Sequence, residues 1–346
     1  MTEASHRIVL ARRPQGTPVP GDFRLEGMAV PEPADGEVLA RTIWLSLDPY
    51  MRGRISEGPS YAKGTAPGEP MQGEGVGQVL ASRNASFAAG DFVAGHGGWQ
   101  SHFVLHGDKL RRLDPKEAPL STALGILGMP GMTAYTGLMA IGRPKAGETL
   151  VTGAASGAVG AVAGQIARLK GLRVVGIAGG AEKCRYVTDE LGFDACLDRN
   201  QPDLAGRLRA ACPDGVDIYV ELTAGEPLWA TLPLMNLFGR IPVIGGIANY
   251  NLNELPQGPD RSPLLMRQIL IRRLTLRGMI VWDFSEMEAE FRREVSGWLR
   301  AGSIRYREDV TDGLENAPQA FIGMLEGRNF GKQLVRVSPD PTRPGQ

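Results

Sequence analysis

The segment from residue 148 to residue 171, ETLVTGAASGAVGAVAGQIARLKG, constrains the fold of this chain more than any other. An apolar run ends at Gly153, and Ala155-x-Gly157-x-x-Gly160 follows it and opens a helix with one apolar face. Gly157 lets the backbone approach a pyrophosphate, and Gly160 lets the helix pack closely on the strand. Ala155 replaces the usual first glycine, but strand, loop and helix follow in the required order. The segment therefore predicts a dinucleotide-binding unit whose helix start offers N–H groups to phosphates.

The same alternation of short apolar runs and helical spacing continues along the chain. The further runs are RVVGIA (173–178), DACLD (194–198), VDIYVEL (216–222), RIPVIG (240–245) and LTLRGMIV (274–281). Six strands alternating with helices predict a doubly wound parallel sheet, the Rossmann arrangement. Pro242 argues against a regular fifth strand, because proline cannot donate to a sheet ladder. Residues 285–301 have the pattern of an amphipathic helix.

The N-terminal third has a different texture. Its apolar runs are short and alternate with polar residues, as in EVLARTIWLSL, GEGVGQVLAS, GDFVAG and QSHFVLH, and Gly, Pro and Asp separate them. This pattern indicates a β-rich domain, and short strand-like pieces return after Ile304. We therefore place a β-rich domain at 1–128 and 304–346, and a nucleotide-binding domain at 129–303.

Composition narrows the class of protein. The 38 Lys and Arg residues balance 38 Asp and Glu residues, which argues against a nucleic-acid partner. Cys184, Cys196 and Cys212 have no CxxC spacing, and we expect reduced thiols packed as small apolar residues in a cytoplasmic protein. The uncharged stretch 118–142 contains five glycines and two prolines, so we expect buried structure there and no membrane span.

The end of the second predicted strand distinguishes between the two nicotinamide cofactors. NAD-binding proteins usually carry an acidic residue there for the ribose 2′-hydroxyl. Here the chain reads Ile177-Ala178-Gly179-Gly180, with Lys183 shortly after and Arg199 past the third strand. Small residues and two cations suit a 2′-phosphate, so we expect NADP(H).

The sequence lacks the residues that two other classes of enzyme require. Short-chain dehydrogenases need Tyr-x-x-x-Lys, and none of the seven tyrosines has a lysine at that spacing. Catalytic zinc usually takes three protein ligands. No cysteine precedes Cys184, and His96, His102 and His106 have no HExxH spacing. We therefore expect no metal site.

The chain as a whole resembles the medium-chain dehydrogenase/reductases. More narrowly, it resembles the zinc-independent branch of prostaglandin reductases, plant alkenal double-bond reductases and the bacterial curcumin reductase. The matching segments are LSLDPYMR (45–52), MQGEGVGQV (71–79), LGMPGMTAYTGL (127–138), AASGAVG (154–160), EKCRYVTDELGFDA (182–195), GGIANYN (245–251) and GRNFGKQLV (327–335). They cover nearly the whole chain in family order.

The resemblance implies a GroES-like catalytic domain with a Rossmann domain inserted in it, and a homodimer. It also implies NADPH-dependent reduction of the C=C bond of an α,β-unsaturated aldehyde or ketone. In that reaction the β-carbon accepts hydride, and the enolate oxygen that forms needs hydrogen-bond donors. We expect the phenols of Tyr50, in DPYMR, and Tyr250, in GGIANYN, to be the catalytic donors.

The chain departs from the family at three cofactor positions. Arg199 stands where the family often has Tyr, Leu222 where it has Asn, and Ala248 about where it has Ser. The expected cofactor-binding residues are Met129, Thr133, Ala155, Ser156, Gly157, Ala158, Val159, Gly160, Gly179, Gly180, Lys183, Arg199, Leu222, Gly245, Gly246, Ile247, Tyr250, Ile280, Val281, Trp282 and Asn329. Two other functions stay open at this point: a quinone reductase, and an NADPH-binding sensor or structural protein without turnover.

Overall fold

The structure of the chain is a computed structural model that describes residues 4–58, 60–254, 256 and 258–343. By its internal contacts the chain forms two units, one of Met1–Gly125 with Glu308–Gln346 and one of Ile126–Arg307. We refer to them as unit 1 and unit 2. Their limits fall at 125/126 and 307/308.

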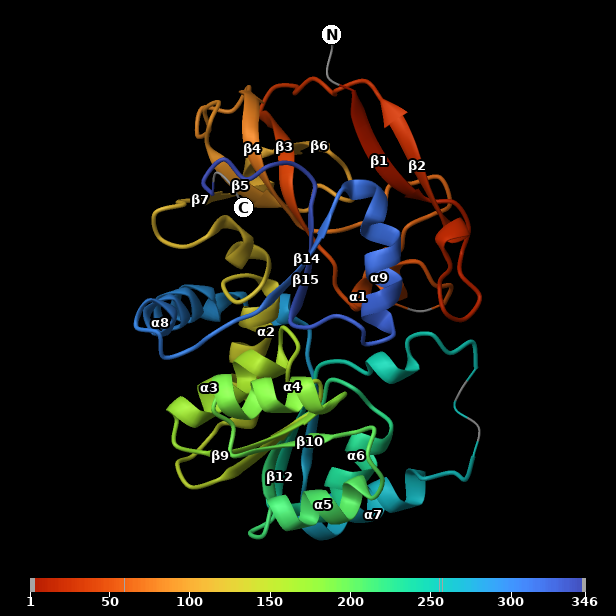
Figure 1. The fold of residues 1–346 in the computed structure, drawn as a ribbon, viewed down its shortest axis with the longest axis vertical. Coiled ribbons are helices and arrows are strands. Elements are labelled where there is room, and N and C mark those ends of the chain that lie inside the picture. Colours follow the sequence, from red (N-terminus) through yellow and green to blue (C-terminus); the bar gives the residue numbers. More distant parts are fainter. Residues whose placement is uncertain (1–3, 59, 255, 257, 344–346) are drawn as a thin grey trace. The chain divides into compact units, whose positions relative to one another are not determined.

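Unit 2 contains a six-stranded parallel sheet with the order β10-β9-β8-β11-β12-β13. Helices α3 and α4 cover one face of it, and α5, α6 and α7 cover the other (Figure 1). Right-handed crossovers produce this placement when the strand order reverses at the first strand. The prediction of a doubly wound sheet is confirmed. The strands are β8 (Thr149–Thr152), β9 (Arg173–Ala178), β10 (Ala195–Asp198), β11 (Val216–Val220), β12 (Met235–Val243) and β13 (Thr275–Gly278).

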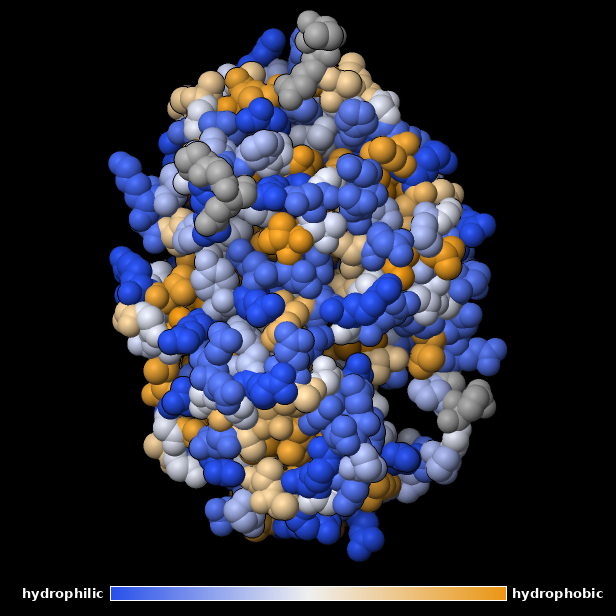
Figure 2. Space-filling model, in the orientation of Figure 1, coloured by the Kyte–Doolittle hydropathy of each residue, from blue (hydrophilic) through white to orange (hydrophobic). Residues whose placement is uncertain are grey.

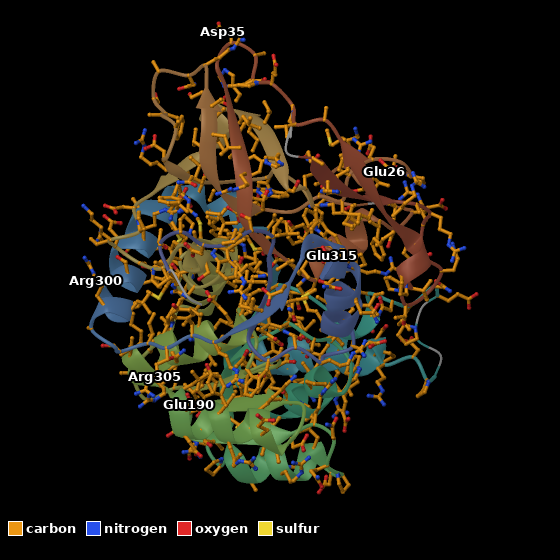
Figure 3. The ribbon with its side chains drawn as sticks, turned by 45° about the horizontal axis from the view of Figure 1, so that its top comes forward. Glu26, Asp35, Glu190, Arg300, Arg305 and Glu315 are labelled. Carbon is orange, nitrogen blue, oxygen red and sulfur yellow. The ribbon has the colours of Figure 1, made fainter. Side chains whose placement is uncertain are left out.

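The helices of unit 2 fill the connections between these strands. They are α2 (Met129–Thr136), α3 (Gly160–Leu169), α4 (Ala181–Arg185), α5 (Leu204–Ala211), α6 (Glu226–Thr231), α7 (Ser262–Arg272) and α8 (Glu288–Arg300). The 3₁₀ and π helices are η4 (Gly137–Gly142), η5 (Tyr186–Glu190), η6 (Leu232–Leu234), η7 (Ile247–Asn249) and η8 (Val281–Met287). The predicted helix at 285–301 thus begins as η8 and continues as α8. Charged side chains such as Glu190, Arg300 and Arg305 are exposed (Figure 3).

The objection that Pro242 raised was wrong. Strand β12 runs through Pro242, which lies opposite Arg277 of β13, and the carbonyl of Pro242 accepts the N–H of Glu221 at 3.0 Å. The register between β11 and β12 shifts between Val216 and Ile218, opposite Met235 and Arg240, so the irregular part of this ladder lies before Pro242. A proline is tolerated where the ladder does not need its missing donor.

Unit 1 is built around a seven-stranded, mainly antiparallel sheet. The order is β14-β15-β3-β4-β5-β7, with β6 also paired to β3, and β1 and β2 form a separate pair. The strands are β1 (Ser5–Leu10), β2 (Phe23–Met28), β3 (Glu37–Ser46), β4 (Gly75–Ser82), β5 (Phe92–Gly95), β6 (His102–His106), β7 (Arg111–Leu113), β14 (Glu308–Asp312) and β15 (Lys332–Arg336). The helices are α1 (Tyr50–Arg54) and α9 (Ala317–Leu325), with η1 (Pro20–Asp22), η2 (Gly107–Lys109), η3 (Leu120–Leu124) and η9 (Leu314–Asn316). The β-rich prediction is confirmed.

Helix α9 corrects the expectation of short strand-like pieces after Ile304. Seven of its nine residues are buried, so the segment has no polar face and its apolar run looks like a strand in the sequence. Its Phe321 packs against Phe23 and Trp99, with ring centroids 6.3 and 5.6 Å away. The C-terminal segment therefore completes the core of the N-terminal one. On the face shown in Figure 2, hydrophilic residues predominate and hydrophobic ones form small separate groups.

Candidate active site

The loop between β8 and α3 brings backbone very close to backbone. A Cβ atom at Gly160 would lie 2.5 Å from the carbonyl oxygen of Ala154 and 2.8 Å from that of Gly153. Ala154 itself adopts a positive φ of 46°, and the N–H of Gly157 closes the turn onto the carbonyl of Ala154 at 2.8 Å. Glycine at 160 is therefore required for the helix to start against its own loop.

The residues at the start of α3 include backbone N–H donors without an acceptor among the described residues. The N–H groups of Ser156, Ala158 and Val159 have no hydrogen-bond acceptor within the described ranges of the chain. They lie directly before Gly160, where the positive end of the helix dipole adds to their field. Free N–H groups at a helix start form an anion-binding site.

The end of β9 holds the cations that the sequence pointed to, together with an acid that it did not. Gly180 has a φ of 93° and open space beside it, and Lys183 lies on the first turn of α4. The exposed Arg199 follows β10, and its Nε lies 3.2 Å from the position a Cβ on Gly179 would take. The carboxylate of Asp198 accepts the N–H groups of Gly180 and Asn200 at 2.8 and 2.9 Å. These two bonds hold the pKa of Asp198 below its usual range.

The loops after β11 and β12 are joined by backbone hydrogen bonds. The N–H of Ile247 reaches the carbonyl of Leu222 at 3.3 Å, and the N–H of Ala248 reaches that of Thr223 at 3.0 Å. Tyr250 follows η7, and its hydroxyl oxygen accepts the N–H of Gly246 at 3.3 Å. Among the described residues no acceptor meets the hydroxyl proton of Tyr250. This phenol is therefore oriented by the backbone and keeps its own proton for donation.

A buried glutamate shapes these loops, and the sequence analysis missed it. Glu221 is 4% exposed, and its Oε1 accepts the N–H groups of Thr223 and Ala224, both at 2.7 Å. Ala224 has a positive φ of 58°, so the carboxylate holds a strained turn in place. Burial raises the pKa of Glu221. An acidic residue directly after a buried strand was the available signal.

The remaining predicted cofactor residues of unit 2 flank the sheet. Met129 and Thr133 lie on α2, and the Thr133 hydroxyl donates to the Met129 carbonyl at 2.7 Å. Ile280, Val281 and Trp282 follow β13, and the indole of Trp282 is 54% exposed. Because all six strands are parallel, the segments after them begin at one edge of the sheet. The structure thus brings together at that edge the predicted residues that follow the strands of unit 2.

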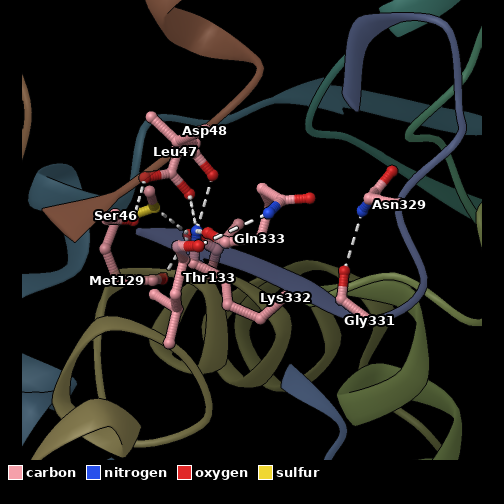
Figure 4. A network of polar contacts seen from close by, with 10 residues as sticks. Ser46, Leu47, Asp48, Met129, Thr133, Asn329, Gly331, Lys332 and Gln333 are labelled. Atoms are coloured by element: carbon pink, nitrogen blue, oxygen red, sulfur yellow. Dashed lines mark hydrogen bonds and ion pairs between the residues drawn. The ribbon is translucent and has the colours of Figure 1, made fainter. Parts of the chain in front are cut away.

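Tyr50 and Asn329 belong to unit 1. Tyr50 begins α1, and the guanidinium of Arg54 lies 5.5 Å from its ring centroid and 4.3 Å from that of Tyr61. Burial, with Asp48 and Glu74 adding to it, raises the pKa of Tyr50 well above its usual range, so the phenol stays protonated. The Asn329 amide donates to the carbonyl of Gly331 at 2.8 Å (Figure 4), a contact within its own turn.

The histidines make local contacts, and the side chains of Cys184 and Cys196 hydrogen-bond to each other. The buried His102 contacts the Ser101 hydroxyl at 3.1 Å, and His106 contacts Asp108 at 2.8 Å. The described ranges contain no group of three or more His, Cys, Asp or Glu side chains that could hold a metal ion. Cys212 is buried as expected, whereas Cys184 and Cys196 are half-buried. None of the helices described is long and apolar enough to span a bilayer.

Comparison with known proteins gives a consistent result. The family model "N-terminal domain of oxidoreductase" matches residues 6–113, and "Zinc-binding dehydrogenase" matches residues 158–296. The NADPH-dependent curcumin reductase of Escherichia coli (strain K12) is 52% identical over 339 residues, covering 98% of both chains. The chain belongs to the medium-chain dehydrogenase/reductase family.

Further similarities place it within that family. The 2-alkenal reductase (NADP(+)-dependent) of Nicotiana tabacum is 39% identical, over 97% of this chain and 98% of the relative. The crystal structure of CurA in complex with NADPH from Vibrio vulnificus superposes with a TM-score of 0.94 at 48% identity, covering 97% of this chain and 100% of the other. This medium-chain oxidoreductase therefore falls in the branch of the curcumin and alkenal reductases.

The buried carboxyl of Glu221 predicts a pH-dependent stability. A carboxyl whose pKa is higher in the folded chain holds its proton more tightly there, so its contribution is present at low pH and is lost as pH rises through the folded-state pKa. Glu221→Gln keeps an oxygen for both N–H groups and removes the ionisation. The melting temperature of the unaltered chain minus that of Glu221→Gln should fall between pH 4.5 and pH 8. The exposed Glu226→Gln serves as the control, and a constant difference for Glu221→Gln would contradict the prediction.

Proposed function

We propose that this chain reduces the C=C bond of small α,β-unsaturated aldehydes or ketones with NADPH. The observation that carries the proposal is Tyr250, an oriented phenol with an unused proton at the same sheet edge as the glycine loop. The similarity to curcumin and alkenal reductases supports the same reaction class. A phenol donor suits an enolate oxygen, and hydride addition to an enone produces one.

The residues of unit 2 fit NADP(H). The unpaired N–H groups of Ser156, Ala158 and Val159 suit the pyrophosphate. Gly180, beside open space, leaves room next to Lys183 and Arg199 for a 2′-phosphate. Asp198 follows β10 rather than β9, and its Oδ1 already accepts two backbone N–H groups. We propose that the other predicted cofactor residues of unit 2 also contact bound NADP(H). We propose unit 1 as the catalytic domain.

The side chains of this protein then have distinct tasks. Bound NADPH supplies the hydride that the β-carbon of the substrate accepts. Tyr250 donates to the carbonyl oxygen as negative charge grows on it, and Tyr50 acts as a second protonated donor. Because the phenol of Tyr50 has a strongly raised pKa, it stays a hydrogen-bond donor throughout the neutral pH range. Water can supply the proton that the α-carbon takes.

Steady-state oxidation of NADPH against a panel of substrates tests the proposed reaction. Enals and enones should be turned over faster than quinones and saturated ketones, and NADH should serve poorly as a replacement. Prolonged treatment with a chelator should leave the rate unchanged. Turnover of quinones alone would indicate a quinone reductase, and NADPH binding without turnover of any substrate would indicate a non-catalytic protein. Equal rates with NADH would contradict the assignment of the cofactor.

The hydroxyl of Tyr250 should matter for turnover and not for cofactor affinity. Tyr250→Phe keeps the ring, and we expect turnover of an enone to fall roughly tenfold, less than the ~10²–10³ typical of one lost oxyanion donor, because a ribose hydroxyl or water can take its place. The dissociation constant for NADPH should change little, since a contact made in the transition state alters kcat. Tyr306→Phe, a half-buried tyrosine of the same unit, is the control. Unchanged turnover in Tyr250→Phe would make the ring a packing residue.

We also propose that the chain forms a homodimer through the free side of β13. In the described part of the sheet β13 pairs only with β12, so its other side has unpaired backbone groups. The neighbouring apolar side chains of Phe238 on β12 and of Met266 and Leu270 on α7 are 62%, 63% and 75% exposed. An unprotected edge strand beside exposed apolar residues suits pairing with a second copy.

Light scattering should give twice the mass of the chain. Leu270→Glu should shift the protein toward the monomer, because it puts a charge on the exposed apolar face. Leu169→Glu, at an exposed position of α3, should leave the mass unchanged. A monomeric unaltered chain would contradict the proposal.

A further inference from the structure

A lysine is buried at the start of β15, where the sheet of unit 1 meets the loop that leads to Tyr50. Lys332 is 4% exposed, and its ammonium group donates to the carbonyl of Leu47 at 2.6 Å, to Oδ1 of Asp48 at 3.0 Å and to the carbonyl of Gln333 at 3.1 Å (Figure 4). All three donors of the ammonium group are therefore used, and two of the acceptors belong to the loop between β3 and α1.

Asp48 is held equally firmly from its other side. It is 5% exposed, and its Oδ2 accepts the hydroxyl of Ser46, the last residue of β3. Its backbone carbonyl accepts the N–H of Met51 at 3.1 Å, inside the turn that begins α1. The Leu47 N–H also reaches the Gln333 carbonyl at 3.2 Å. Side-chain and backbone bonds thus fix both residues that lie immediately before Pro49 and Tyr50.

The same cluster controls the charge around the Tyr50 phenol. Burial is the largest cause of the raised pKa of Tyr50. The negative charge of Asp48 is the second cause, and that of Glu74 is the third. Burial also raises the pKa of Glu74 and of Glu308, the residue opposite Lys332 in the pairing of β14 with β15. The positive charge of Lys332 opposes this rise in the pKa of Glu74. The charges of His96 and Arg111, which come from other segments of unit 1, oppose it as well. Without Lys332, Asp48 would be a buried carboxylate without its ion-pair partner.

Stability alone does not account for such an arrangement. Replacing a buried ion pair with apolar residues of similar size is often neutral or stabilising, because both charges lose their hydration on burial. A lysine that uses two of its three donors to fix one short loop gives geometric definition instead. Active-site groups must be held to within about 0.5 Å of the productive position.

We propose that Lys332 is a positioning residue for catalysis, and that through Asp48 and the Leu47 carbonyl it holds Tyr50 where its phenol donates to the substrate oxygen. The inference rests on the proposed function, since it assigns Lys332 a role in that reaction. Lys332 itself need not touch the substrate.

A double-mutant cycle between Lys332→Met and Tyr50→Phe tests the inference, with kcat and KM measured on an enone. Each single variant should lower kcat about tenfold, and the double variant should be little worse than either single one, because residues that act through one group are not additive. NADPH affinity should stay within about twofold, since a group acting only at the reacting atoms leaves ground-state binding intact. Lys109→Met, a 71%-exposed lysine, should behave as the unaltered enzyme.

Two more variants guard against a failure to fold. Asp48→Asn keeps an oxygen near the ammonium group and the Ser46 hydroxyl but removes the charge, so it should fold and show the same non-additivity with Tyr50→Phe. Lys332→Arg keeps the charge but carries a rigid planar fork, so it should recover part of the lost kcat. Thermal unfolding of each variant identifies any that is not folded at the assay temperature.

The outcomes separate the two proposals. Losses of kcat that multiply in the double variants would overturn the positioning role and leave the proposed reaction untouched, as would normal turnover in Tyr50→Phe. Absence of enone turnover in the unaltered chain would overturn the proposed function and this inference with it.

Discussion

The close contact between the start of α3 and the loop before it determines the rest of the nucleotide-binding end. Gly160 has space only for a hydrogen, because two carbonyl oxygens lie within 2.8 Å of the position a Cβ would take. The N–H groups of residues 156, 158 and 159, directly before Gly160, have no acceptor in the part of the chain that the structure describes. Burial of the sheet alone would not produce this geometry. A bulkier residue at 160 would have to move the loop, and the donors would move with it.

The second determinant is the way in which distant segments complete unit 1. β15 pairs with β3 antiparallel, with Leu334 opposite Ser46, although nearly three hundred residues separate them in the sequence. This pairing puts Lys332 beside the loop before Tyr50. It also lets Phe321 of α9 pack against Trp99. The chain must therefore have folded back on itself before the loop around Tyr50 can be fixed.

The sequence predicted those parts of the structure that depend on local pattern. The six strands of unit 2, the glycine loop, and the positions of Lys183 and Arg199 follow from apolar runs and from glycine spacing. Helix α9 was missed because burial on nearly all sides removes the polar face by which a helix is recognised. Pro242 was misjudged because the demand on its N–H depends on the register of two neighbouring strands.

The residues missed at the site share a different property, since their partners lie outside any local pattern. Glu221 accepts a hydrogen bond from a turn in which Ala224 has a positive φ. Asp198 accepts the N–H of Gly180, eighteen residues earlier in the chain. The hydrogen-bond partners of Lys332 include Leu47 and Asp48, which lie near the opposite end of the chain. A single sequence shows that such residues are polar, but it does not show whether water or protein satisfies them.

The two tyrosines show how the same group can be prepared in two ways. Tyr250 lies in the loop after β12, and one backbone N–H orients its hydroxyl group. This neutral contact leaves the hydroxyl proton available for donation. Tyr50 is surrounded by buried charge, with Asp48 and Glu74 opposing its ionisation and Arg54 stacked on its ring. A donor that depends on a loop can shift as ligands enter, whereas a donor fixed by a buried ion pair cannot easily do so. In the proposed reaction Tyr50 would therefore be the donor held firmly within its own unit, and Tyr250 would be the donor able to adjust when ligands bind.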